Sequence, residues 1–214
     1  VRMDAHACYK KDYISQCIWH IENVQANNVG GPTVVKGKTK KQKIIAAAYN
    51  SPFALGGASH YKRGFEGYSD TVSWGCFKRD YLISIGMYDE RLPRSEDDDL
   101  NYRIQKNGGK IYITPKICSE YYPRDSFTKL FKQYFEYGVW KIAFIKKHKR
   151  PPRINQLVPM LFVIFTILFG ILSIFSNLCF GLYMFGMSVY LITNVYFSFK
   201  NKDLTSFCDK LMLV

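Results

Sequence analysis

Acidic residues are scarce in this sequence, and several common signatures are missing. It has 17 Asp and Glu against 30 Lys and Arg, a formal net charge of +13 at pH 7. Neither G-x-G-x-x-G nor G-x-x-x-x-G-K-[ST] occurs, so the nucleotide-binding folds that those loops define are not supported. The six cysteines form no C-x-x-C pair and no dense framework, which favours free thiols in a reducing compartment.

Charge is also absent from one long stretch. The 46 residues of 154–199 include no Asp, Glu, Lys, Arg or His. Because about 20 apolar residues cross a bilayer, this stretch predicts two transmembrane helices, at about 157–175 and 178–199, with a polar turn at Ser176-Asn177. Core helices of a soluble protein are the alternative, although such helices seldom lack charge on every face.

Cations flank the uncharged stretch at both ends. They are Lys146, Lys147, Lys149, Arg150 and Arg153 before it, and Lys200 and Lys202 after it. By the positive-inside tendency, both ends of the helical hairpin lie in the cytoplasm. We therefore expect a cytoplasmic domain over 1–150, two transmembrane helices over 151–200 and a cytoplasmic tail over 201–214, in a multi-pass protein of the cell membrane. The basic excess suits anionic lipids and anionic substrates such as nucleotides or lipid phosphates.

Against this basic background stands the acidic run Ser95-Glu96-Asp97-Asp98-Asp99-Leu100-Asn101. One interpretation is structural, because carboxylates complement the N-terminal end of a helix and Ser95 is a suitable N-cap. The other is chemical. Adjacent carboxylates repel one another, which raises the pKa of some of them and is tolerated where a cation or a proton transfer uses them. Arg91 or Arg94 is expected to offset their charge.

Two weaker patterns concern ligands. In an extended segment Asp4 and His6 point to the same face, so that they can share one divalent cation. A zinc site drawn from His6, Cys8, Cys17 and His20 matches no zinc-finger or zinc-ribbon spacing. Five lysines within 36–43 predict a solvated or lipid-facing loop rather than a nucleic-acid contact.

The remaining patterns predict short elements. We expect helices over 13–24, 46–49, 81–86, 100–106 and 126–144, strands over 74–77 and 110–114, the end of a strand within 2–7, and a turn over 27–32.

The order of these motifs resembles that of the family 2 glycosyltransferases with the GT-A fold, in particular the membrane-associated enzymes of succinoglycan-type exopolysaccharide synthesis. Arg2-Met3-Asp4-Ala5-His6 is similar to the family's Asp-x-Asp metal motif, and Ser95-Glu96-Asp97 to its Glu-Asp motif. Segments 51–57, 70–72, 75–79 and 86–90 resemble the part that precedes the catalytic motif.

The resemblance implies an α/β fold with a GT-A-like mixed sheet and flanking helices, followed by the transmembrane hairpin. It implies the transfer of a sugar, with inversion, from a nucleotide-sugar donor to a lipid-linked or saccharide acceptor. The partners that it implies are other polysaccharide-synthesis proteins and not nucleic acid. The resemblance further implies that Asp97 is the base, that Glu96 supports it, and that Asp4 and His6 hold a divalent cation, Mg²⁺ or Mn²⁺. The substrate-binding residues that it implies are Gly57, Asp70, Trp74, Gln133, Trp140 and Lys141.

Two departures from the family pattern affect these expectations. The segment 133–141 only loosely echoes the Gln-x-x-Arg-Trp motif of processive members. The family also places about a hundred residues, including the nucleotide-binding part, before its metal motif, so the resemblance implies a C-terminal part of an enzyme. A non-catalytic, membrane-tethered interaction fragment and a metal-dependent phosphotransferase are the alternatives.

Overall fold

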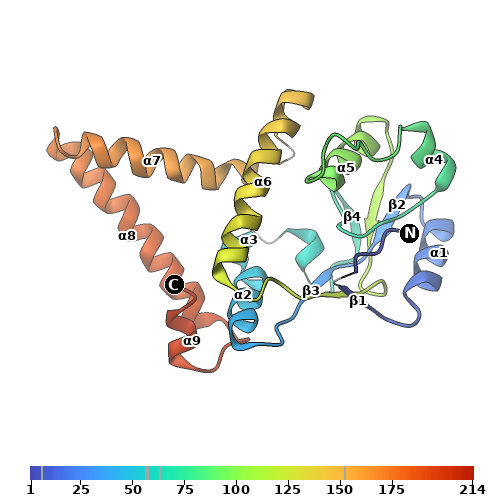
Figure 1. Cartoon of the computed structure of the whole chain (residues 1–214), viewed down its shortest axis with the longest axis horizontal. Coiled ribbons are helices and arrows are strands. Elements are labelled where there is room, and N and C mark those ends of the chain that lie inside the picture. The colour runs from blue at the N-terminus through green and yellow to red at the C-terminus, as the bar shows by residue number, and fades with distance from the viewer. Residues whose placement is uncertain (6, 56–57, 63, 152) are drawn as a thin grey trace.

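Short strands and amphipathic helices alternate over the first 125 residues, and the rest of the chain is helical. The computed structural model describes residues 1–5, 7–55, 58–62, 64–151 and 153–214 (Figure 1). Its α/β part forms two mixed sheets, and helices α7 and α8 extend from it as an arm. The expectation of a mixed α/β fold is confirmed.

The four-stranded sheet has the order β4-β6-β2-β5, and the three-stranded sheet has the order β1-β7-β3. Within them β2 pairs with β6 and β3 with β7 in parallel, while the other pairs are antiparallel. The strands are β1 (Ala7–Tyr9), β2 (Asn28–Gly30), β3 (Thr33–Val35), β4 (Gly67–Ser69), β5 (Cys76–Phe77), β6 (Ile111–Ile113) and β7 (Ser119–Tyr121).

The turn predicted over 27–32 is wrong, because this segment contains β2, an inner strand of its sheet. Its glycines serve close packing instead of a reversal. A Cβ on Gly30 would lie 2.4 Å from Val72 Cγ2, and one on Gly31 would lie 1.1 Å from the carbonyl oxygen of Ile117. Glycine is required here because backbone and side chains of neighbouring segments approach too closely for any other residue.

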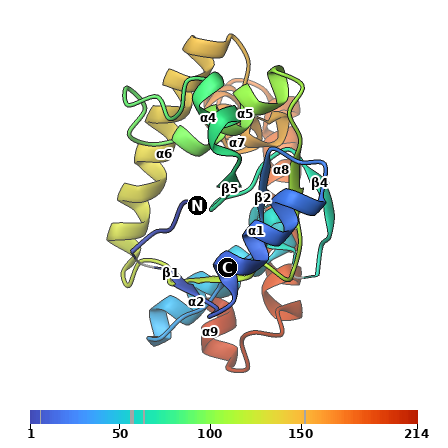
Figure 2. The ribbon, with the colours of Figure 1, turned by 90° about the vertical axis from the view of Figure 1, so that its right-hand side faces the viewer.

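Amphipathic spacing identified most helices of the α/β part. The helices are α1 (Tyr13–Asn23), α2 (Lys40–Asn50), α3 (Pro52–Leu55), α4 (Arg79–Ser84), α5 (Glu96–Lys106) and α6 (Phe127–His148), with a 3-10 turn, η1 (Ser59–Tyr61). Those predicted over 13–24, 81–86, 100–106 and 126–144 are confirmed. Figure 2 shows the N-terminal segment entering below α4 and α5.

Two predictions near the N-terminus need correction. The lysine run is only partly a loop, because Thr39 and Gln42 form a reciprocal capping box and the helix already begins at Lys40. The short helix expected over 46–49 is therefore the end of a longer one. Residues 2–5 are not the end of a strand, since they lie in no strand and β1 begins only at Ala7.

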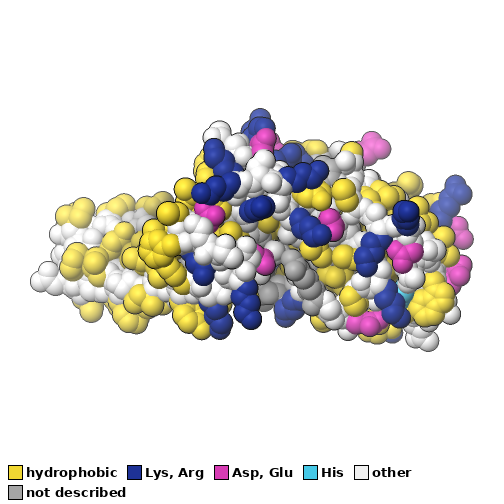
Figure 3. Space-filling model, turned by 90° about the horizontal axis from the view of Figure 1, so that it is seen from below, with side chains coloured by type: hydrophobic (Ala, Val, Ile, Leu, Met, Phe, Trp, Pro, Cys, Tyr) yellow, Lys and Arg dark blue, Asp and Glu magenta, His cyan; other side chains and the backbone are white. Residues whose placement is uncertain are grey.

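The arm consists of α7 (Val158–Leu172), entered through a 3-10 turn η2 (Ile154–Leu157), and α8 (Asn177–Lys200). The rings of Phe162 and Tyr190 join them, with centroids 4.6 Å apart. Of the described helices, α8 is long and apolar enough to cross a membrane, whereas α7 is shorter. Figure 3 shows hydrophobic side chains, and no charged ones, over the outer part of the arm.

After α8 the chain turns back to the α/β part. Leu204 packs against Ile44 and Ala47 of α2, and the Asn201 side chain donates a hydrogen bond of 3.0 Å to the carbonyl of Ala47. The short helix α9 (Phe207–Leu211) follows, and Lys40 forms an ion pair of 3.1 Å with Asp209. The segment that follows the arm therefore lies against the α/β part.

Candidate active site

The acidic run opens α5, as the sequence predicts, but without the expected side-chain cap. Ser95 lies in the left-handed region, at φ 61°, and within the described residues its side chain makes no capping hydrogen bond. A non-glycine residue in this conformation costs about 1–3 kcal/mol. The turn that presents the carboxylates is thus held in a strained conformation by its surroundings, and the carboxylates themselves complement the start of the helix.

Asp97 is the carboxyl of this run whose pKa is raised. Burial is the largest cause, followed by the negative charges of Asp98 and Glu96, and together they raise the pKa of Asp97 to about 7. The charge of Arg2 and a hydrogen bond of 2.9 Å from the Asp98 backbone N–H oppose the shift. A carboxyl with this pKa can accept and release a proton at neutral pH, which is the property that a general base needs.

The N-terminal segment lies beside the acidic run, so the two motifs predicted to act together are close in space. The Arg2 backbone N–H donates to the carbonyl of Gly75 at 3.0 Å. Its guanidinium donates to Glu96 Oε1 at 2.7 Å and lies 3.6 Å from Asp4 Oδ1. Burial lowers the pKa of Arg2, but Glu96 and the other acidic neighbours raise it further, so Arg2 stays charged.

The predicted metal pair is described only in part. His6 lies outside the described residues, and Asp4 contacts the same Arg2 guanidinium that binds Glu96. No group of three or more His, Cys, Asp or Glu side chains within the described residues is placed to hold a metal ion. The donors that are present are carboxylate oxygens, the type that Mg²⁺ and Mn²⁺ prefer.

Helix α6 contains three of the predicted substrate-binding residues and brings one of them, Lys141, to the acidic run. Lys141 Nζ donates to Asp98 Oδ2 at 2.9 Å. Gln133 is buried and its Nε2 donates to the hydroxyl of Tyr137 at 2.7 Å, whereas its Oε1 has no hydrogen-bond partner in the described part of the chain. A buried amide oxygen that accepts no hydrogen bond lowers the stability of the fold, unless a bound molecule donates one to it. Trp140 is half-buried on the same helix.

Asp99 is fully buried and joins α5 to the end of α6. Its carboxylate accepts hydrogen bonds from Arg103 Nε at 2.8 Å and from Lys147 Nζ at 2.5 Å. It also forms a hydrogen bond of 2.7 Å with His148 Nε2. Burial alone would raise the pKa of Asp99, but these three partners lower it below its usual value. Asp99 is therefore a structural anion, in contrast to Asp97.

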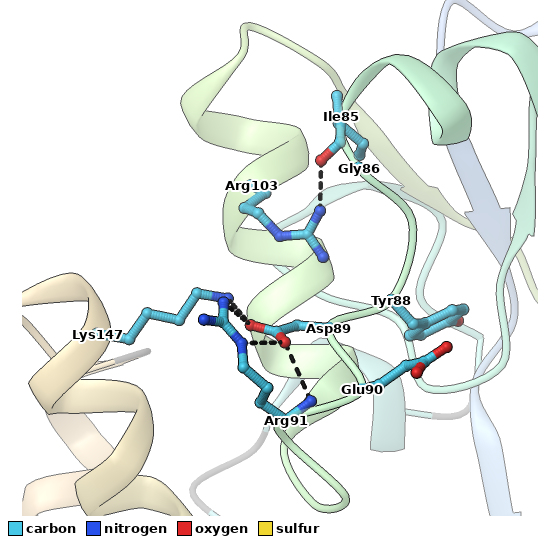
Figure 4. Close-up of a pocket in the computed structure, with 8 residues that line it drawn as sticks. All are labelled: Ile85, Gly86, Tyr88, Asp89, Glu90, Arg91, Arg103 and Lys147. Atoms are coloured by element: carbon cyan, nitrogen blue, oxygen red, sulfur yellow. Dashed lines mark hydrogen bonds and ion pairs between the residues drawn. The ribbon is translucent and has the colours of Figure 1, made fainter.

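A charged groove adjoins this cluster, and Arg103 and Lys147 line it (Figure 4). Asp89 accepts hydrogen bonds from Arg91 Nε at 2.9 Å and from Lys147 Nζ at 2.8 Å, and these two cations lower its pKa. Arg94 pairs with Glu136 at 3.1 Å. Within the described residues neither Arg91 nor Arg94 forms an ion pair with the acidic run, and of the expected charge compensation only a longer-range attraction between Arg91 and Asp99 is seen. The partners of the run are Arg2, Arg103, Lys141, Lys147 and His148.

A second hollow borders the acidic helix. Its lining residues are Asp70, Thr71, Asp98, Asn101, Tyr102, Gln105 and Arg153. Asp70, a predicted substrate-binding residue, forms an ion pair of 2.9 Å with Arg153. Burial and the nearby charge of Arg153 lower the pKa of His60 to about 3, so its imidazole is neutral beside this ion pair.

The other predicted substrate-binding residues lie elsewhere or are not described. Trp74 is 7% exposed and packs in a core cluster with Tyr121, their ring centroids 6.1 Å apart. Gly57 lies outside the described residues. Of the predicted set, the structure brings Asp4, Glu96, Asp97, Asp70 and Lys141 to the start of α5.

Sequence analysis gave no role to Asn101, which fixes α5 to the sheet. Its Nδ2 donates to Thr71 Oγ1 at 2.8 Å and to the carbonyl of Val72 at 3.0 Å, and its Oδ1 accepts from Asn28 Nδ2 at 3.0 Å. All of these bonds are buried, so they hold the helix in one position. The position of Asn101 at the end of the acidic run was the available signal. Arg2, also missed as a site residue, had no comparable signal.

Comparison with known proteins shows what the chain is similar to. The sequence aligns over most of its length with two proteins, a succinoglycan biosynthesis protein and a glycosyltransferase, and is homologous to both. The resemblance predicted from its motifs is confirmed. No family model matches the sequence.

The first relative is the succinoglycan biosynthesis protein ExoA of Rhizobium meliloti (strain 1021), 30% identical over 177 residues, which are 83% of this chain and 53% of that protein. The second, from Methanococcus voltae, is dolichyl N-acetyl-alpha-D-glucosaminyl phosphate 3-beta-D-2,3-diacetamido-2,3-dideoxy-beta-D-glucuronosyltransferase. It is 29% identical over 150 residues, 67% of this chain and 46% of that protein. The chain thus spans about half the length of the relatives it matches.

Proposed function

We propose that this chain supplies the catalytic base of an inverting glycosyltransferase with a GT-A-type fold, which moves a sugar from a nucleotide-sugar donor to a membrane-associated saccharide or lipid-linked acceptor in polysaccharide synthesis. The observation that carries the proposal is the environment of Asp97, a carboxyl with a pKa of about 7 at the start of α5. Its neighbours Glu96, Asp98 and Asp99 are each tied to a cation. Homology to two proteins of glycan biosynthesis supports it.

The reaction is a single displacement at the anomeric carbon. The acceptor hydroxyl oxygen forms the new bond to this carbon as the bond to the nucleotide diphosphate breaks, and the hydroxyl proton moves to Asp97. One displacement inverts the configuration. Glu96 and Arg2 hold each other at 2.7 Å, which keeps a positive charge near the carboxylate that receives the proton.

A divalent cation, Mg²⁺ or Mn²⁺, bound by Asp4 and His6, would supply positive charge that neutralises the diphosphate leaving group. Asp4 and Glu96 both contact the guanidinium of Arg2, so Asp4 lies near the acidic run, which supports this assignment. We assign substrate contacts to Gln133, whose free carbonyl oxygen needs a hydrogen-bond donor, and to Lys141 beside Asp98.

We also propose that α7 and α8 form a membrane hairpin and that the α/β part lies on the cytoplasmic face. The length and composition of α8 support a membrane span. The contact of Leu204 with α2, and the ion pair of Arg153 with Asp70, support a hairpin that leaves and returns on one side. The cations at both ends of the hairpin favour the cytoplasmic side.

The experiment is a transfer assay on membranes from cells that produce the full-length gene product. A panel of radiolabelled nucleotide sugars is offered, and incorporation into extractable lipid-linked saccharide is measured. Wild-type membranes should label this fraction from at least one donor, Asp97→Asn membranes should not, and the exposed-site control Asp80→Asn should match wild type. Equal labelling by Asp97→Asn and wild type would contradict the proposal.

A further inference from the structure

Arg2 contacts three other segments of the chain, besides Asp4 in its own segment. Its backbone N–H donates to the carbonyl of Gly75 at 3.0 Å. Its Nη2 donates to Glu96 Oε1 at 2.7 Å, and its Nε lies 3.6 Å from Asp4 Oδ1. The central carbon of the guanidinium lies 5.7 Å from the ring centroid of Tyr88, within the range of a cation–π contact. Arg2 thus joins the N-terminal segment to the loop before α5 and to the first turn of that helix.

This set of contacts requires an arginine. Two nitrogens of one guanidinium reach carboxylates on two segments, whereas the ammonium of a lysine replaces the charge but not the fork. The Arg2 side chain is 25% exposed, so its ion pairs are screened less than pairs at an open surface. Its Nη1 is buried and has no hydrogen-bond partner within the described residues. Because a buried donor without a partner lowers stability, folding alone does not explain an arginine at this position.

Charged and titratable groups from several elements surround Asp97. On α5 the negative charges of Asp98 and Glu96 raise its pKa, and on α6 Lys141 is paired with Asp98 at 2.9 Å. The positive charge of Arg2 lowers the pKa of Asp97. Burial raises the pKa of the nearby tyrosines, so that they are neutral at pH 7 and do not offset the negative charges. These tyrosines are Tyr61 of η1, Tyr88 of the loop before α5 and Tyr137 of α6.

We infer that Arg2 is a positioning residue of the proposed transfer reaction, which binds the segment of Asp4 to the first turn of α5 and supplies a positive charge to the surroundings of Asp97. This inference rests on the proposed function, because the role of Asp97 as the base gives that charge its use. Without the charge of Arg2, Asp97 would keep its proton to a higher pH and would be a poorer proton acceptor at neutral pH.

The test compares Arg2→Gln, which removes the charge, with Arg2→Lys, which keeps the charge without the fork. The measured quantity is kcat/KM for sugar transfer by the full-length gene product, as a function of pH. Arg2→Gln should move the rise of kcat/KM to higher pH by roughly one unit or more, so that the rate falls severalfold at pH 7 and recovers in alkaline buffer. Arg2→Lys should leave the rise near its wild-type position.

Arg91→Gln is the matched control for the loss of an arginine charge. The Arg91 side chain is 84% exposed and its carboxylate partner is Asp89, outside the acidic run. This variant should therefore keep the wild-type pH profile.

A second measurement needs no sugar transfer. The difference in free energy of unfolding between wild type and Asp97→Asn is followed against pH, and the pair is then compared again with Arg2→Gln present in both. Between the unfolded and the folded pKa of Asp97 the folded state binds more protons, so this difference grows with pH and levels off at the folded value. Arg2→Gln should move the levelling point upward by the same amount as the kinetic profile.

Each result decides the inference. A lower rate for Arg2→Gln at every pH, with the wild-type profile, would overturn it, because a residue that only stabilises the fold gives that result. A shift that Arg2→Lys fails to restore would also overturn it. Wild-type transfer by Asp97→Asn would overturn the proposed function instead. In that case a moved levelling point would still support the effect of Arg2 on Asp97, whereas an unmoved one would overturn both.

Discussion

Two aspartates separated by one residue illustrate how the surroundings set the role of a side chain. Asp99 is fully buried, yet three cationic side chains lower its pKa. Asp97 is shielded from solvent and lies beside the negative charges of Asp98 and Glu96, which raise its pKa to about 7. The first arrangement stabilises the folded state when the carboxyl is ionised, whereas the second makes ionisation unfavourable. A proton acceptor therefore costs folding stability, as catalytic groups often do.

The raised pKa of Asp97 predicts how stability depends on pH. Between the unfolded value near 4 and the folded value near 7, the folded state binds more protons, so this group's contribution falls as pH rises. Asp97→Asn should raise the free energy of unfolding at pH 8 by on the order of 1–2 kcal/mol after allowance for solvent, and change it little at pH 5. Intrinsic fluorescence in detergent would measure this. An equal effect at both values of pH would mean that the pKa is not raised.

Asp99 predicts the opposite behaviour. Asp99→Asn leaves the charges of Arg103 and Lys147 without their anion, so it should destabilise the fold by roughly 3–5 kcal/mol at pH 7, and less as pH falls through the lowered pKa of the wild-type carboxyl. Asp125→Asn is the matched control, because Asp125 also pairs with a cation four residues later but is exposed. Comparable losses in urea unfolding of the two variants would contradict the assignment.

At the scale of elements, the sequence pattern predicted what depends on local periodicity. Helices α1, α5 and α6 and strand β6 were found because their apolar spacing extends over enough residues. The three-residue strands β1, β3 and β7 are too short to show alternation. Strand β2 was missed because Gly30 and Gly31 are typical of turns, whereas here they allow close contact with Val72 and Ile117.

The candidate site was predictable to the same degree. The acidic run predicted the start of a helix. The order of the motifs predicted that Asp4 would act together with Glu96 and Asp97. Neither pattern predicted which cation would pair with each carboxylate. Arg2, Lys141 and Lys147 are far from the run in sequence, and only tertiary packing brings them to it. A sequence pattern contains no signal for such pairings.

The arrangement of the whole molecule depends on the tail that follows the arm. Leu204 and Asn201 pack on α2, and the hydroxyl of Ser198 donates to the carbonyl of Lys210, so that the tail lies against the α/β part. If α7 and α8 cross a membrane, residues before and after them must then face the same compartment.

The native cysteines can test this arrangement. Cys8 and Cys208 are both exposed, and they lie before and after the arm. A membrane-impermeant maleimide should label both in vesicles with the cytoplasmic face outward, and neither in vesicles of the opposite orientation. Single Cys8→Ser and Cys208→Ser variants assign the labelled sites. Labelling of the two cysteines from opposite sides would show that the chain crosses an odd number of times.

The measurement that tests the central claim most directly is the pH dependence of kcat/KM for sugar transfer by the full-length gene product. With Asp97 as the base, kcat/KM should rise with pH through an apparent pKa of about 7. Asp97→Asn should lower it by on the order of a hundredfold or more and remove this rise. Asp80→Asn, at an exposed site on α4, should keep both. An Asp97→Asn variant with the wild-type pH profile and rate would contradict the assignment of Asp97 as the base.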